Sequence, residues 1–310
     1  MKSSDVGALI ALAAVWGASF LFLRVAVPDF GPVAVIALRV GIAAVFLAPF
    51  LVWRGDPLAL AARWRPLLIV GVMNSALPFL LYAWAMLSVT AGFAAITNAT
   101  APLFTALIAW IWLRDRLSRG GLVGLLVGFF GVVVLVWPKL GDGSPAQLLA
   151  VAACLGATLC YGWSASYTKR ALVGLAPITI AAGSQVFAAL ALIPFAVSAW
   201  PSQSPGAWAW GAAVALGVLC TGVAYMLYFR LLANVGPART VAVTYLIPPF
   251  GMVWGWLLLG EQVTASMLLA CGVILLGTGL ASGVIGRRRV ESGPSSGLKD
   301  EAGRPEPANR

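Results

Sequence analysis

Trp16-Gly17-Ala18-Ser19, followed by Arg24, returns about 145 residues later as Tyr161-Gly162-Trp163-Ser164, followed by Lys169. Both copies lie in almost continuously apolar sequence. A duplicated apolar unit is typical of transporters built from two similar halves around a shared central site. The duplication therefore predicts a membrane transporter. It narrows the function more than any catalytic motif, because we find none.

A second pair of motifs repeats with nearly the same offset. Pro102, with Asp115 thirteen residues further on, returns as Pro248 with Glu261 thirteen residues further on. The acid follows the proline at the same distance in both copies. We therefore expect the acids to end corresponding helices of the two copies.

The composition indicates a polytopic membrane protein. The chain is 61% hydrophobic and 10% charged, whereas soluble domains carry about 25% charged residues, and its mean hydropathy is +0.95. The net charge of +10 lies in short loops between apolar runs, as the positive-inside rule expects. We therefore interpret Arg287 to Arg289 as the cytoplasmic end of the last helix rather than as a nucleic-acid-binding patch.

The nucleophilic and metal-binding residue types give no sign of catalysis. The chain has no His, which excludes His-based metal sites, Ser-His-Asp catalysis and a His proton relay. The four Cys lie in apolar runs without metal-ligand spacing, so we interpret them as packing residues. We expect no metal, no cofactor and no enzymatic activity. Residues 1–5 lead directly into a full-length span, so we expect an uncleaved first helix.

Ten apolar runs are each long enough for a membrane span of about 20 residues. Five spans per repeat is an odd number, so the second copy would enter the membrane from the opposite side. The predicted fold class is all-α integral membrane, with ten transmembrane helices in two inverted-topology five-helix repeats. We expect the repeats at 5–138 and 147–285 and a disordered cytoplasmic tail at 286–310. The predicted spans are 5–25, 32–53, 66–87, 91–113, 120–138, 147–168, 178–199, 207–229, 238–259 and 264–285.

The loop charges predict the orientation. With a cytoplasmic N-terminus, fourteen loop cations lie inside and two, Arg24 and Lys139, lie outside. We therefore expect the protein in the cell (inner) membrane, with both termini in the cytoplasm.

These motifs resemble the EamA family of the drug/metabolite transporter superfamily. The resemblance rests on the ten-span hydropathy, the Trp-Gly-x-Ser element with its Tyr-Gly-x-Ser echo, and the proline-to-acid signature, and it covers roughly residues 5–285. The first copy has Asp115 where the family commonly has Glu. The resemblance implies a ten-helix bundle with a central cavity that exports or exchanges small metabolites. It does not imply one substrate, since members carry amino acids, other metabolites and drugs.

Polar and aromatic side chains in mid-span are candidates for lining the solute site. Unpaired polar groups are costly in hydrocarbon, so they should face the bundle interior. Ordinary interhelical hydrogen bonds, worth about 0.6–2 kcal/mol, and core packing of the aromatic rings are the alternatives. The candidate substrate-binding residues are Trp16, Ser19, Asn74, Tyr82, Asn98, Tyr161, Trp163, Tyr225, Thr244 and Tyr245. Ser75, Thr97, Thr100 and Thr221 are further mid-span polar groups of the same kind.

Charged and small residues in the spans have more than one interpretation. Arg39 is the one cation well inside a span. It is either a candidate anion-binding group or a structural residue that snorkels to the outer interface or pairs with a helix-end carbonyl. No acid lies in mid-span, so Pro102, Asp115, Pro248 and Glu261 are interpreted as structural or gating residues. Glycine stripes at Gly120, Gly124 and Gly128, and at Gly279 and Gly283, would close each half or make a homodimer.

The sequence therefore predicts a secondary transporter that moves amino acid-like or drug-like solutes by alternating access. Its partners would be a small-molecule solute and the lipid bilayer, with no nucleic acid. A nucleotide-sugar or sugar-phosphate exchanger of the same superfamily is one alternative, although it would need several intramembrane cations. A non-transporting membrane scaffold or receptor is another, but it would not require inverted duplication.

Overall fold

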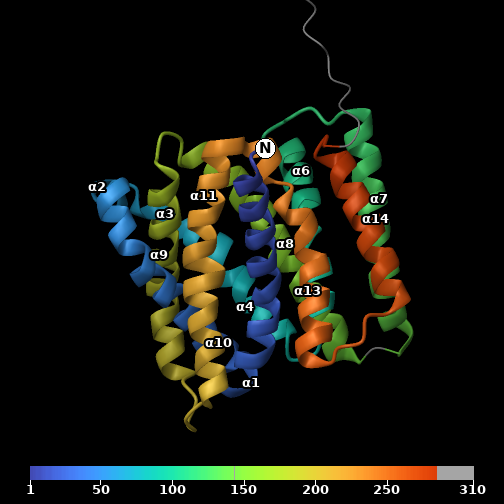
Figure 1. Ribbon diagram of the computed structural model, residues 1–310, viewed down its shortest axis with the longest axis horizontal. Coiled ribbons are helices and arrows are strands. Elements are labelled where there is room, and N and C mark those ends of the chain that lie inside the picture. The colour runs from blue at the N-terminus through green and yellow to red at the C-terminus, as the bar shows by residue number, and fades with distance from the viewer. Residues whose placement is uncertain (143, 285–310) are drawn as a thin grey trace, which may run out of the picture.

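The computed structural model describes residues 1–142 and 144–284, and within them the chain is helical and contains no strand (Figure 1). The expected tail at 286–310 lies outside the described residues. Seven helical stretches are long and apolar enough to cross a membrane, and two more, Val243–Leu259 and Ala265–Ala281, are shorter and apolar. The prediction of an all-α, multi-pass membrane protein is thus confirmed. The seven stretches are Ser3–Arg54, Trp64–Ala85, Ala91–Trp112, Arg119–Leu140, Pro145–Ala171, Pro177–Ser198 and Ala207–Val235.

The first element, α1 (Ser3–Arg54), contains two antiparallel arms. Its helical geometry is broken at Gly31, where φ is 71° and ψ is 163°, a conformation that suits glycine because it has no Cβ. The Val15 carbonyl lies 3.2 Å from Cys220 Sγ, and Arg39 Nε lies 3.1 Å from Thr221 Oγ1. Cys220 and Thr221 are consecutive, so both arms pack against the same turn. Figure 1 shows that the second arm (32–54) turns back from the first (3–30) and runs toward α2. The predicted loop between spans at 26–31 is wrong, because helix continues to Phe30.

Two helices contain a π-helical segment at matching places. The first runs through α3 (Trp64–Gly71), η1 (Val72–Ala76) and α4 (Leu77–Ala85). The second runs through α10 (Ala207–Gly217), η2 (Val218–Val223) and α11 (Ala224–Val235). A π-helical turn widens the helix and is frequent at functional sites. The sequence analysis did not predict either one.

The remaining elements complete the bundle. The helix predicted at 91–113 is interrupted between Asn98 and Ala101, shortly before Pro102. The predicted span at 238–259 begins only at Val243, because Gly236 has a positive φ of 80° and a separate short helix follows it. The elements are α2 (Pro57–Ala62), α5 (Ala91–Asn98), α6 (Ala101–Trp112), α7 (Arg119–Asp142), α8 (Pro145–Ala171), α9 (Pro177–Ser198), α12 (Pro237–Thr240), α13 (Val243–Leu259) and α14 (Ala265–Ala281).

The repeated glycines lie where helices touch. A Cβ added to Gly17 in α1 would stand 2.7 Å from Phe250 Cβ in α13. A Cβ added to Gly162 in α8 would stand 2.7 Å from the carbonyl carbon of Phe104 in α6. Both distances are shorter than packed side chains allow, so each motif glycine brings two helices into close backbone contact.

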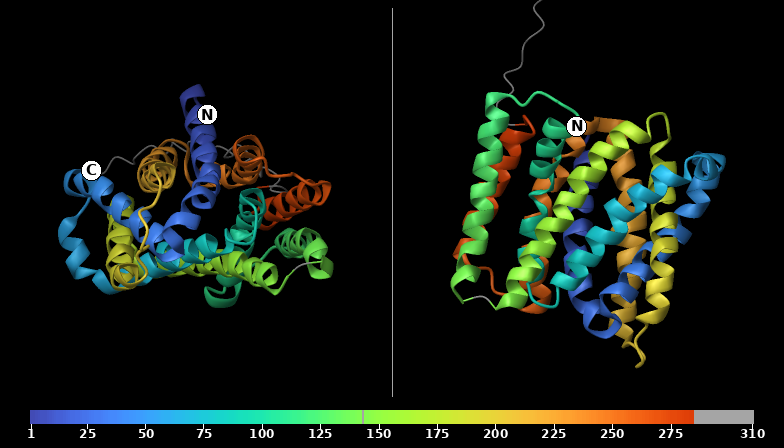
Figure 2. Two further views of the ribbon diagram at one scale, coloured as in Figure 1. Left: turned by 90° about the horizontal axis from the view of Figure 1, so that it is seen from below. Right: turned by 180° about the vertical axis from the view of Figure 1, so that it is seen from behind.

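The glycine stripe of α7 packs against α14, and Figures 1 and 2 show these helices side by side. A Cβ on Gly124 would stand 2.3 Å from the Ala281 nitrogen, and one on Gly277 would stand 2.2 Å from the Gly128 nitrogen. The contact joins the last helix of the first copy to the last helix of the second. The alternative that these stripes close each half separately is therefore wrong for Gly124 and Gly128.

We predict that Gly17→Ala and Gly162→Ala each lower the free energy of unfolding by about 1–3 kcal/mol, because the new methyl group overpacks a backbone contact. The control is Gly272→Ala in α14, where an added Cβ meets nothing within 4 Å. Thermal denaturation of the purified protein in detergent measures the difference. Equal midpoints for all three variants would show that the glycine contacts carry no special constraint.

Candidate functional site

Arg39 lies buried between η2 and α4. Its side chain is 5% exposed, and Nε donates to Thr221 Oγ1 of η2 across 3.1 Å. The guanidinium carbon stands 3.7 Å from the centre of the Phe79 ring in α4, a cation–π contact. The interpretation of Arg39 as a snorkelling interfacial residue is therefore not supported.

A second polar contact mirrors the first. Gln185 Nε2 in α9 donates to Ser75 Oγ of η1 across 2.8 Å, just as Arg39 donates to a hydroxyl of η2. The Tyr225 side chain lies near those of Asn74 and Ser75. Tyr161 and Tyr225 both lie near Arg39. We call Arg39, Asn74, Ser75, Gln185, Thr221 and Tyr225 the polar cluster.

Aromatic side chains extend from Tyr161 toward α5. The rings of Tyr82 and Tyr161 are stacked with centroids 6.5 Å apart, and Phe20 meets the Tyr82 ring edge-on at 5.3 Å. The Tyr82 hydroxyl donates to Asn98 Oδ1 across 3.4 Å. Three of the predicted solute-site residues thus form one chain of contacts beside the polar cluster.

Other predicted residues lie apart from the cluster or bond locally. Trp163 stacks on Trp112 at 5.5 Å and on Tyr167 at 5.1 Å, and Tyr245 contacts Ser282 near the end of α14 at 2.8 Å. The structure thus does not bring Trp163 or Tyr245 into contact with the polar cluster. Trp16 contacts the Tyr228 ring of α11 at 5.8 Å. Ser19 and Thr244 bond locally, to the Trp16 and Val241 carbonyls three residues back.

The sequence analysis missed two members of this region. Gln185 follows Ser184, the position that corresponds to Arg39 in the second copy, and a mid-span amide is itself a signal of an interior-facing position. Phe79 gives no sequence signal that separates it from other apolar residues.

The two motif acids end matching helices but bind different partners. Asp115 pairs with Lys169 Nζ across 3.0 Å. Glu261 accepts hydrogen bonds from the backbone N–H groups of Ala91 at 2.9 Å and Gly92 at 3.2 Å, so it caps the N-terminus of α5. Both acids therefore connect a helix of one copy to a helix of the other.

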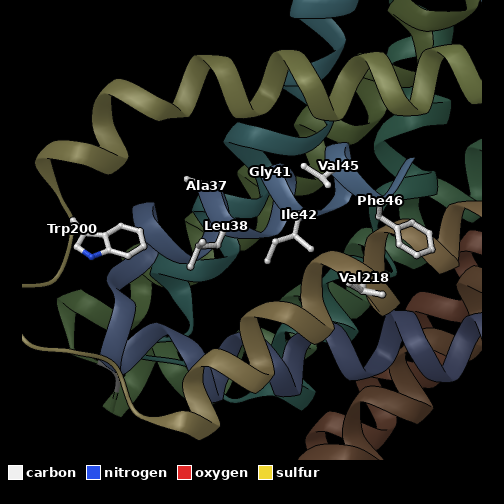
Figure 3. Close-up of a pocket in the computed structure, with 8 residues that line it drawn as sticks. All are labelled: Ala37, Leu38, Gly41, Ile42, Val45, Phe46, Trp200 and Val218. Carbon is white, nitrogen blue, oxygen red and sulfur yellow. The ribbon is translucent and has the colours of Figure 1, made fainter. Parts of the chain in front are cut away.

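An apolar pocket of about 570 Å³ lies outside the polar cluster. Figure 3 shows its lining on the second arm of α1, with Val218 of η2 and Trp200 before α10. Val45 on its wall is 76% exposed, and Arg39 is not among its lining residues. The pocket opens on the outer surface of the bundle, and the indole N–H of Trp200 is the one side-chain polar group in its lining. Its residues are Ala37, Leu38, Gly41, Ile42, Val45, Phe46, Trp200 and Val218.

The sequence profile of the EamA-like transporter family matches residues 5–137 and 148–283. The chain belongs to this family. An uncharacterized transporter of Archaeoglobus fulgidus is 24% identical, over 84% of this chain and 92% of its own. A probable terminal-alkyne amino-acid exporter of Streptantibioticus cattleyicolor is 26% identical, over 94% and 98%. An S-adenosylmethionine/S-adenosylhomocysteine transporter of Chlamydia muridarum is 25% identical, over 85% and 86%.

The fold is also similar to a solved crystal structure. The two superpose with a TM-score of 0.65 over 93% of this chain and 100% of the other, at 20% sequence identity. Membership of this transporter family agrees with the expected family and with the membrane-spanning helices, and it points away from an enzyme.

We predict that the two acids differ in their contribution to stability. Glu261→Ala leaves two amides at the start of α5 without a partner and should cost about 1–3 kcal/mol. Asp115→Ala should cost about 0–1 kcal/mol, because the side chains of Lys169 and Asp115 are 67% and 52% exposed. Thermal denaturation in detergent tests this order, and a larger loss for Asp115→Ala would contradict it.

Proposed function

We propose that the chain is a secondary transporter that moves small organic metabolites by alternating access, with the solute held at the polar cluster. The observation that carries this proposal is the convergence of buried polar groups from both copies. Arg39 and Ser75 belong to the first copy, and Thr221 and Gln185 belong to the second. A site made by both halves changes its exposure when the halves rock, which alternating access requires.

The ten-helix inverted repeat stays our proposal for the architecture. The two arms of α1 would provide two crossings, six stretches would each provide one, and the shorter α13 and α14 would provide the last two. The matched π-helical segments and the matched glycine contacts support the duplication. The repeats at 5–138 and 147–285 are proposed on the same grounds.

The loop charges support an inner-membrane location with both termini cytoplasmic. Alkaline phosphatase, which is active outside the cytoplasm, should be inactive when fused after residue 285 and active when fused at Gly141. The reverse pattern would overturn this orientation.

Amino acid-like solutes are the substrates that we favour. Two relatives are named for amino acids or their S-adenosyl derivatives. A nucleotide-sugar or sugar-phosphate exchanger would need several intramembrane cations. Among the described residues, Arg39 is the one Lys or Arg that is buried.

Metabolite profiling of cells and medium tests the proposal. Overexpression should change the distribution of at least one small metabolite relative to an empty vector. Asn98→Leu, which removes the amide beside Tyr82, should abolish that change at normal protein levels. The matched control is Asn234→Leu, whose amide bonds Asp5 at 3.1 Å away from the cluster and should keep the change.

The two ways of failing are distinct. If no metabolite is redistributed by the wild-type protein, the transport proposal is wrong. If Asn98→Leu retains full transport, the transport proposal stands and the region beside Tyr82 is not the site.

A further inference from the structure

Arg39 has no counterion among the side chains that the structure describes, which are those of residues 1–140, 144–236 and 239–284. Within them, Asp115 and Lys169 make the one ion pair. Glu261 lies at the N-terminus of α5, and Asp5, Asp29 and Asp56 hydrogen-bond to Asn234, to the Gly206 amide and to the Ala59 amide respectively. A buried charge without a partner is strongly unfavourable. The ring of Phe79 and the hydroxyl of Thr221 offset part of that cost.

The outer edge of the guanidinium is left for a ligand. Arginine has five N–H donors in a planar fork, and its one hydrogen bond to a described residue uses Nε. Neither Nη group has a hydrogen-bond partner among the described side chains, so both are available to a ligand. Tyr161 and Tyr225 lie near the guanidinium.

We infer that Arg39 binds a carboxylate of the transported solute. The planar fork matches a carboxylate with two parallel hydrogen bonds. One buried cation balances one negative charge, whereas a phosphate with nearly two negative charges would leave charge uncompensated. The inference rests on the proposed transport function and adds the chemical group that the site recognises.

The test compares the metabolites that are redistributed by the wild type and by three variants. Those metabolites should carry a carboxylate, and Arg39→Gln should reduce their transport by about tenfold or more at equal protein levels, because charged hydrogen bonds are lost. Arg39→Lys keeps the charge but lacks the planar fork, so its transport rate should lie between those of the wild type and Arg39→Gln. The control is Lys139→Gln, which removes a cation near an aromatic ring, Phe93 at 5.1 Å, outside the cluster.

Each result bears on the inference. Transported compounds without a carboxylate, or phosphorylated compounds only, would overturn it while the transport function stands. Full transport by Arg39→Gln would also overturn it. If the wild type redistributes nothing, the transport proposal fails and the inference fails with it. If Arg39 only stabilises the fold, Arg39→Gln should lower the amount of protein in the membrane. A fluorescent fusion measures that amount separately from transport.

A different observation carries a second inference, about gating. The first arm of α1 touches α13 at Gly17 and Gly251, and α8 touches α6 at Gly162 and Thr105. A cation follows each motif glycine by seven residues: Arg24 follows Gly17, and Lys169 follows Gly162. An acid follows each contacted residue by ten: Glu261 follows Gly251, and Asp115 follows Thr105. The same packing register therefore brings a cation and an acid toward each other in both copies.

Only one of these two pairs is formed among the described residues. Lys169 and Asp115 are paired, whereas Arg24 donates to the Met86 carbonyl and Glu261 accepts from the amides of Ala91 and Gly92. We propose that the pairs alternate: Arg24 and Glu261 pair in the opposite transport state, in which Lys169 and Asp115 separate. This step rests on the alternating access proposed above.

Thiol cross-linking tests the exchange. Pro28→Cys and Gln262→Cys place exposed thiols beside Arg24 and Glu261, and the four native cysteines are buried. Lys169→Gln should release the present pair and raise the cross-linking rate about two- to fivefold, the range expected for an exposed ion pair. Arg170→Gln, the neighbouring exposed cation, is the control and should leave the rate unchanged.

Adding Glu261→Gln to the Lys169→Gln variant should cancel the rise, because the alternative pair can no longer form. A rate that Lys169→Gln leaves unchanged, or a rise that survives Glu261→Gln, would overturn the exchange. Neither outcome concerns the solute, so the carboxylate inference stays separate.

Discussion

The close backbone contacts at Gly17 and Gly162 are the constraint on which the rest of the site depends. Lipid tails are as apolar as leucine, so the hydrophobic effect does little to hold membrane helices together, and close packing of small residues takes its place. These two contacts fix the first arm of α1 against α13 and α8 against α6. Once that register is fixed, Val15 reaches Cys220 and the returning arm brings Arg39 to Thr221.

The π-helical segments help to position the polar cluster. A widened turn changes the carbonyl that each side chain can reach, and Thr221 Oγ1 donates to the Leu216 carbonyl five residues back at 2.9 Å. The same hydroxyl accepts from Arg39. One threonine therefore satisfies a carbonyl of the widened turn and anchors the buried cation, so the local distortion and the site stabilise each other.

The sequence predicted the features that depend on hydropathy and spacing, and it missed those that depend on contacts. Helix positions followed from apolar runs, whereas the contacts of the two motif glycines were not predicted. The sharp turn at Gly31 was not predicted, because a single residue makes it and a hydropathy profile averages over many residues. The π-helical segments and the pairing of Tyr245 with Ser282 escaped because both are decided by neighbouring helices that a local pattern does not contain.

The two copies differ at one backbone position, where one has an N–H group and the other has a proline. Glu261 caps α5 through the amides of Ala91 and Gly92. The corresponding residues of the second copy are Pro237 and Ala238, and proline has no N–H to offer. Asp115 therefore lacks the equivalent two-amide partner, and it pairs with Lys169 instead. The two ends of the protein therefore hold their acids with different partners of unequal strength. Under the alternating access proposed above, the two transport states would then differ in free energy even though the helices that form them are duplicated.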